Sequence, residues 1–113
     1  MVSPRVIEIR AYDGSLILLS SEVVDHIVRK HPQMFSIVGF SKDQIVITLI
    51  HALETPSEVF LDTLGSKHFI KEVGDVYLNV IVIEDSVKTA YLIGNRTYAR
   101  MRRARWLRRL YSV

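Results

Sequence analysis

Cysteine is absent from this 113-residue chain, which excludes a disulfide framework and a thiolate metal site. A chain without cysteine suits a reducing compartment, and its first residues lack the apolar core of a signal peptide, so we expect a cytoplasmic protein. Long hydrophobic runs are missing as well. The longest uncharged apolar stretch, Val76 to Ile83, is interrupted by Asn79 and is far shorter than the roughly 20 residues of a membrane helix. We therefore expect no transmembrane segment.

Carboxylates are absent from the last eighteen residues, Arg96 to Val113, which hold seven of the ten arginines. Residues 1–95 carry eight Lys and Arg against all twelve Asp and Glu, so this part is acidic although the whole chain has a formal charge of +3. Such segregation of charge is typical of a protein that holds an anionic partner, most simply a phosphate backbone, with its basic segment.

Several catalytic signatures are also missing. The sequence contains no Gly-rich phosphate loop, no H-E-x-x-H and no G-x-S-x-G, which argues against NTP hydrolysis, metalloprotease activity and serine hydrolysis. His26 and His31 are five residues apart, roughly 140° around a helix, so they cannot bind one ion together. We expect neither a metal site nor a cofactor.

The pattern of apolar residues and turn signals predicts a single α+β domain over residues 1–95, followed by an arginine-rich C-terminal helix or tail over 96–113. Two helices should cover one face of a mostly antiparallel sheet in the order ββααββββ, leaving the other face partly open. In the basic segment, Met101, Ala104, Leu107 and Tyr111 would share one side of a helix. The expected elements are a hairpin around Asp13-Gly14, helices at about 22–31 and 41–53, and strands at 58–62, 67–73, 76–84 and 87–93.

A few polar side chains could act on a phosphodiester. An imidazole such as that of His26 or His31 can transfer a proton near neutral pH, and the guanidinium of Arg29 can neutralise phosphate charge. Thr89 and Tyr91 share one strand face, where they could bind a phosphate or stack on a base.

Each of these groups also has an ordinary structural explanation. His31 suits a helix C-terminus, and His26 suits a solvated helix face. Thr89 and Tyr91 are common strand residues, and Lys67 with Lys71 is typical of a protected edge strand. His51 and His68 have no partner that the sequence reveals.

Three ordered segments resemble the small nuclease domains of the barnase, EndoU, colicin and RelE-like assemblage of phage and toxin systems. They are His26-Ile27-Val28-Arg29-Lys30-His31-Pro32, then Ile50 to Val59 with its Thr55-Pro56 pair, and finally Val87-Lys88-Thr89-Ala90-Tyr91. The resemblance spans about residues 5–93. It departs from the pattern at Gln33, where an acidic residue often follows His-Pro, and in the arginine-rich extension.

The resemblance implies a metal-independent endoribonuclease, in which the RNA 2′-hydroxyl attacks the adjacent phosphate. It places His26, His31, Thr89 and Tyr91 in or beside the cleft, with Arg29 on the phosphate. We expect catalytic roles for His26, His31 and Tyr91. Phosphate binding is expected from Arg29, Lys67, Thr89, Arg102, Arg105 and Arg109.

Two other functions remain open from the sequence. One is a non-catalytic module that binds RNA, or alternatively DNA, through the arginine segment. The other is an interaction protein whose basic segment docks on an acidic protein partner, such as an antitoxin, or on an anionic membrane surface. The oligomeric state is not determined by the sequence.

Overall fold

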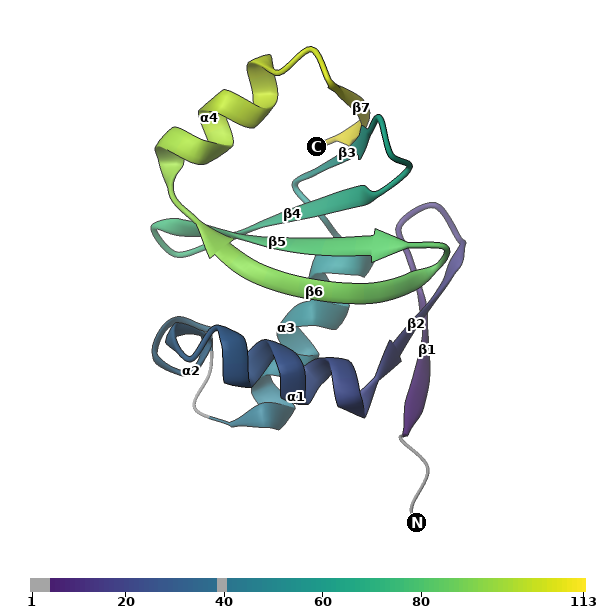
Figure 1. The fold of residues 1–113 in the computed structure, drawn as a ribbon, viewed down its shortest axis with the longest axis vertical. Coiled ribbons are helices and arrows are strands. Elements are labelled where there is room, and N and C mark those ends of the chain that lie inside the picture. Colours follow the sequence, from purple (N-terminus) through teal and green to yellow (C-terminus); the bar gives the residue numbers. More distant parts are fainter. Residues whose placement is uncertain (1–4, 39–40) are drawn as a thin grey trace.

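The computed structural model of the chain describes residues 5–38 and 41–113. Met1–Pro4 and Gly39–Phe40 lie outside the described residues. None of the helices in the described ranges is long and apolar enough to cross a membrane. Figure 1 shows the elements in chain order: β1 (Val6–Arg10), β2 (Leu16–Ser20), α1 (Ser21–Lys30), α2 (Gln33–Ile37), α3 (Lys42–Glu54), β3 (Glu58–Asp62), β4 (Lys67–Val73), β5 (Val76–Ile83), β6 (Ser86–Ile93), α4 (Asn95–Arg103) and β7 (Leu107–Ser112).

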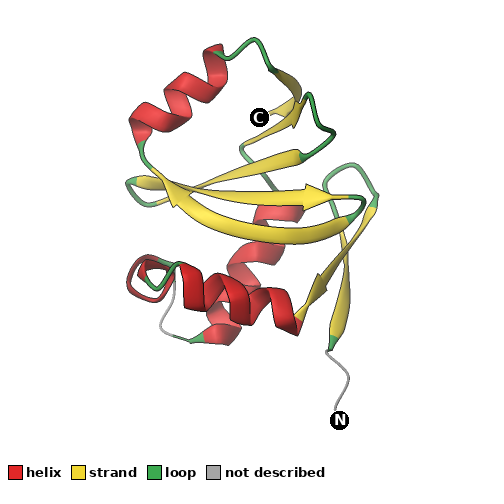
Figure 2. Cartoon of the chain, viewed as in Figure 1, coloured by secondary structure: helices red, strands yellow, loops and turns green. Residues whose placement is uncertain are grey.

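The seven strands form one mixed, curled sheet in the order β1-β2-β6-β5-β4-β3-β7. The meander from β3 to β6 is antiparallel, as predicted, and β2 lies parallel to β6 with a single register pair, Leu18 and Ser86. Bulges between Val59 and Phe60 and between Ile81 and Val82 interrupt the ladders, and bulges bend a sheet. The predicted α+β class is confirmed, and Figure 2 shows helices on both sides of the curled sheet.

The two predicted helices begin at side-chain caps. The hydroxyl of Ser20 accepts a hydrogen bond from the Val23 N–H, and that of Ser41 accepts one from the Gln44 N–H. Such caps satisfy N–H groups that the first helical turn leaves unpaired. These serines therefore fix where α1 and α3 start, and thereby which of their faces meets the sheet.

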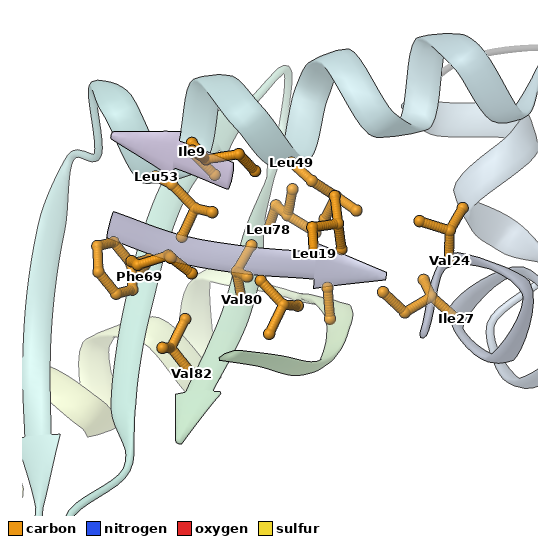
Figure 3. Packing of buried hydrophobic residues seen from close by; sticks show 14 of the residues in the cluster. Ile9, Leu19, Val24, Ile27, Leu49, Leu53, Phe69, Leu78, Val80 and Val82 are labelled. Atoms are coloured by element: carbon orange, nitrogen blue, oxygen red, sulfur yellow. The ribbon is translucent and has the colours of Figure 1, made fainter. Parts of the chain in front are cut away.

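The main core lies between the sheet and the helices α1 and α3. Figure 3 shows Leu78, Val80 and Val82 of β5 with residues from β1, β2, α1 and α3 around them. Ile27, Leu49, Leu53 and Leu78 are completely buried in this cluster. Strand residues that face away from it, such as Asn79, point to the opposite face of the sheet, because side chains alternate along a strand.

The prediction of one partly open sheet face was wrong, because α4 covers that face. Figure 1 places α4 on the opposite side of β4, β5 and β6 from α1 and α3. A second core joins Phe60, Ile70, Ile93 and Leu107, and partly buried side chains pack on it: Tyr77, Tyr91, Tyr98, Met101 and Ala104.

The basic segment is not one helix. The helical pattern from Met101 to Tyr111 is broken after Arg103, and Leu107–Ser112 instead pairs antiparallel with β3. The free edge of β3 supplies hydrogen-bonding groups that a continued helix would have left unpaired, so tertiary pairing overrides the local periodicity. The predicted order also lacked α2, a single short turn after Pro32.

The turn between β5 and β6 stores backbone strain. Its two residues, Glu84 and Asp85, have φ angles of 50° and 62°, in the left-handed region that non-glycine residues rarely occupy. Asn tolerates this region better than Glu. We expect Glu84→Asn to raise the free energy of unfolding by about 0.5–1 kcal/mol in urea titrations. Asp75→Asn, in a neighbouring turn without positive φ at that residue, is the control and should change it little.

Candidate active site between α4 and the sheet

A cavity of about 220 Å³ lies where α4 and the segment after it cover the second face of the sheet. Its floor is formed by side chains of β4, β5 and β6, and its walls by α4 and the following loop. Polar, aromatic and apolar groups all contribute. The lining residues are His68, Asn79, Tyr91, Thr97, Arg100, Met101, Ala104 and Trp106.

Two larger hollows lie on the other side of the molecule. One, of about 480 Å³, opens beside α1 and β2, and its ion pair between Lys42 and Asp25 is more than half exposed. The other, of about 550 Å³, lies between α2 and α3. The cavity under α4 is smaller, but it alone among these three has a floor of buried, mutually hydrogen-bonded polar side chains.

Four side chains, one from each of the strands β3 to β6, form a hydrogen-bonded series along that floor. Asp62 Oδ2 lies 3.0 Å from His68 Nε2, and His68 Nδ1 lies 3.3 Å from Asn79 Nδ2. The same Asn79 Nδ2 donates to Tyr91 Oη at 3.3 Å. His68 and Asn79 are only 7% and 1% exposed, so solvent does not compete for these bonds.

Asp62 begins this series and also organises the turn between β3 and β4. Its Oδ1 accepts hydrogen bonds from the backbone N–H groups of Leu64 and Ser66, both at 2.9 Å. Burial raises the pKa of Asp62, but the hydrogen bond from His68 and these two N–H bonds outweigh it, so the pKa is lowered overall. Asp62 is thus held as a carboxylate against His68.

The direction of each bond follows from that carboxylate. Asp62 can only accept, so Nε2 of a neutral His68 carries the hydrogen and Nδ1 is left as an acceptor for Asn79. Both N–H groups of the Asn79 amide are then used as donors, one to His68 and one to Tyr91. Its carbonyl oxygen, Oδ1, is buried and has no hydrogen-bond partner among the described residues.

His31 and Tyr91, two of the predicted catalytic residues, are in contact. Their rings lie 5.8 Å apart between centroids, tilted by 39°. His31 is the C-cap of α1, and its backbone N–H still bonds to the Ile27 carbonyl at 2.8 Å. β2 pairs with β6 at one register position only, at Ser86 where β6 begins. The end of α1 lies beside the other end of β6, which β2 does not cover. Tyr91 therefore joins His31 on one side to the cavity on the other.

The other residues predicted for the cleft form no part of this contact. Thr89 stands two residues before Tyr91 on the same strand face and is partly buried. His26, also partly buried, and the exposed Arg29 lie on α1. Within the described part of the chain, neither makes a hydrogen bond, ion pair or ring contact with Tyr91.

Lys67 lies on the other face of the sheet. It shares that face with Phe69, which belongs to the main core, and with Lys71, whose Nζ donates to the Thr55 carbonyl at 2.6 Å at the end of α3. The pKa of Asp13 is lowered chiefly by a hydrogen bond from Ser15 and, less strongly, by the charge of Lys67. The structure therefore does not bring Lys67 to Tyr91.

Two of the predicted phosphate-binding arginines are bound to a buried carboxylate instead. Arg102 Nε lies 3.2 Å from Glu58 Oε1, and Arg109 Nε lies 2.9 Å from Oε2. Neither contact has hydrogen-bond geometry, so both are ion pairs by proximity, and Oε2 accepts no hydrogen bond from the described residues. Tyr98 also donates to Glu58, and burial followed by this bond raises its pKa. Arg105, the third arginine of the basic segment that was predicted to bind phosphate, is exposed and forms no ion pair among the described residues.

Sequence reasoning missed the floor of the cavity. It left His68 without a partner and treated Asn79 only as an interruption of an apolar strand. The signal was present, since an amide between Leu78 and Val80 in a central strand must find hydrogen bonds or destabilise the fold. Its partners come from β4 and β6, however, and only the register of the sheet identifies them.

The lowered pKa of Asp62 predicts a loss of stability in acid. A carboxyl with a lowered folded pKa stabilises the fold above its unfolded pKa of about 3.9, and this contribution disappears as pH falls through the folded pKa. We expect Asp62→Asn to lower the free energy of unfolding by about 1.5 kcal/mol near neutral pH. In urea titrations from about pH 7 to about pH 3, the difference from wild type should shrink. Asp75→Asn, an exposed control, should show no comparable trend.

The fold and the side chains of this site are the basis for assigning a function. The described residues include no group of three or more His, Asp or Glu side chains that could hold a metal ion. No protein-family model, no curated protein and no solved structure matches this chain.

Proposed function

We propose that this protein acts on RNA as a metal-independent endoribonuclease, with its active site at His31, Tyr91 and the mouth of the cavity under α4. One observation carries the proposal: the ring contact between His31 and Tyr91, beside a cavity whose rim holds Arg100. An imidazole, a phenol and a guanidinium from α1, β6 and α4 thus share one region. These are groups that transesterification of a phosphodiester requires. The three segments that resemble toxin-type nucleases contribute two of them.

In this mechanism His31 transfers the proton. It removes the proton from the RNA 2′-hydroxyl as that oxygen attacks the neighbouring phosphorus, and it returns this proton to the departing 5′-oxygen as the P–O5′ bond breaks. Bond formation at the 2′-oxygen and loss of the 5′-oxygen leave a cyclic phosphate. Arg100 neutralises the charge of the pentacoordinate phosphate, and Tyr91 orients the nucleotide next to the scissile bond. His26 and Arg29, on the same helix as His31, extend this surface along the RNA.

The exposed arginines supply affinity for the backbone. Arg102 and Arg109 are committed to Glu58, but within the described chain no carboxylate pairs with the remaining arginines of the basic segment. Three of them, Arg96, Arg103 and Arg105, are exposed on α4 and in the loop that follows it. Positive charge on a surface beside the cavity favours a phosphate backbone that runs across its mouth.

Cleavage of single-stranded RNA in the presence of EDTA tests the catalytic assignment. His31→Ala should lower the rate about 10²- to 10⁴-fold, because proton transfer is lost, and Tyr91→Phe should lower it as well. His51→Ala, an exposed histidine on α3 away from the site, is the matched control and should cut like wild type. A His26→Ala, His31→Ala double variant with full activity would contradict the proposal, as would loss of activity with the chelator.

Salt titration of RNA binding tests the role of the arginines. Replacing Arg96, Arg103 and Arg105 together with Gln should reduce the slope of log affinity against log salt by about 2, because each phosphate contact on a single strand contributes roughly 0.7. The same three positions changed to Lys keep the charge and should keep the slope. An unchanged slope in the Gln variant would remove these residues from the interface.

The same surface also supports a binding-only function. Salt dependence would be identical for a module that holds RNA without cutting it, and Gln33 stands where related nucleases often carry a carboxylate. Only an assay for RNA cleavage distinguishes the binding module from the endoribonuclease. Tight, salt-sensitive binding with no cyclic phosphate product would favour the binding module.

A further inference from the structure

We infer that the cavity under α4 binds a single nucleobase, splayed out of the RNA strand next to the phosphate that is cut. This inference rests on the proposed function, because it names the part of the RNA that enters the site. It concerns a different group of residues from those that transfer protons. The inference depends on a buried, unsatisfied amide oxygen that belongs to a residue of the cavity floor, and on the aromatic wall of that cavity.

That acceptor is Asn79 Oδ1. Asn79 is 1% exposed, its two N–H groups are used by His68 and Tyr91, and its oxygen has no partner in the described part of the molecule. Leaving a buried amide carbonyl unpaired costs free energy comparable to a lost hydrogen bond. A ligand that donates a hydrogen bond at this position would recover that cost, and the series from Asp62 holds the amide in place to receive it.

A complementary donor lies beside this acceptor. The hydroxyl oxygen of Tyr91 accepts from Asn79, so its own hydrogen is directed elsewhere, and no bond in the described residues uses it. Acceptor and donor side by side match the donor and acceptor that nucleobases carry next to each other on their edges. Thr97, on the exposed side of the lining, adds a hydroxyl that can do either.

The walls suit a flat, largely apolar ring. Met101 of α4 and Ala104, the C-cap of that helix, line one side, and Trp106 lies at the rim with 53% of its surface exposed. The Trp106 ring meets His68 edge to face, at 6.5 Å between centroids and 78° between planes, so it is held but not covered. Exposed aromatic rings of this kind are stacking surfaces for unpaired bases in proteins that bind single strands.

The floor is unsuited to an anion. The buried Asn79 carbonyl and the carboxylate of Asp62 behind His68 would both disfavour a phosphate deep in the cavity. Positive charge is instead at the rim, on Arg100. This division of charge places the neutral base inside and its phosphate outside, near Arg100 and Tyr91.

Trp106 is the only tryptophan of the chain, so its fluorescence reports on the cavity directly. Titration of the full-length protein with AMP, GMP, CMP and UMP should give saturable quenching with at least one nucleotide. Ribose 5-phosphate, which has the sugar and phosphate but no base, should bind much more weakly. Equal responses to ribose 5-phosphate and to all four nucleotides would overturn the inference, and so would no response to any of them.

Two exposed variants test the contacts without disturbing the cores. Titration calorimetry should show that Trp106→Leu weakens nucleotide binding about 5- to 150-fold, as expected for a lost stacking contact. Thr97→Val should weaken it about 2- to 10-fold. Arg108→Gln removes a charge on β7 outside the cavity and should bind like wild type. If both Trp106→Leu and Thr97→Val bind like wild type, the base does not occupy this cavity.

The two proposals can fail separately. Nucleotide binding that depends on Trp106, in a protein that never cleaves RNA, would leave the base site standing and remove the endonuclease. Cleavage that depends on His31 but is indifferent to Trp106→Leu, without nucleotide binding, would leave the endonuclease standing and remove the base site.

Discussion

The buried carboxylate of Glu58 is the contact on which the second half of the fold depends. It stands at the start of β3, 3% exposed, and is met by Tyr98 and Arg102 from α4 and by Arg109 from β7. A lone carboxylate at this depth would cost several kcal/mol, so these partners make its burial possible. In return, it ties a basic segment to a sheet that would otherwise be open on that face. The cavity exists only because α4 is held there.

Two polar systems under α4 therefore have different tasks. The group around Glu58 is compensated by arginines and a phenol, and it fixes the position of α4 and β7. The series from Asp62 to Tyr91 begins at a carboxylate and includes an acceptor, Asn79 Oδ1, that no described residue satisfies. Native proteins leave few such groups unpaired, and those that remain call for an explanation. The proposed base site fits this difference, because the arginines around Glu58 are used to anchor α4 while the Asn79 amide oxygen is left without a partner among the described residues.

Local patterns in the sequence predicted most of the fold up to Ile93 and little beyond it. The serine caps, the Asp13-Gly14 turn and the alternation of β4 to β6 are local signals, and the structure agrees with them. β7 is different, because Leu107, Leu110 and Tyr111 fit a helix as well as a strand, and only the free edge of β3 decides between the two. The same limit applies to the site. Short motifs contain His31 and Tyr91 and predict that they lie together, as their ring contact shows, whereas the partnership of His68 with Asn79 depends on strand register.

The arginine segment illustrates how composition can suggest a partner without separating two roles. Seven arginines in eighteen residues indicate an anionic ligand, but Arg102 and Arg109 meet their anion within the chain, at Glu58. Composition counts them equally with Arg96 or Arg105, which face solvent. The position of Glu58 separates the paired arginines from the exposed ones. This glutamate lies forty residues before Tyr98 in the chain and is adjacent to it in space. Because Glu58 pairs with two of these charges and places α4, the remaining arginines lie on α4, on the loop after it and on β7 rather than on a loose tail. Under the proposed function, α4 links two tasks, because it covers the cavity and also carries Arg100, which lines that cavity, so a phosphate held by Arg100 would lie beside Tyr91.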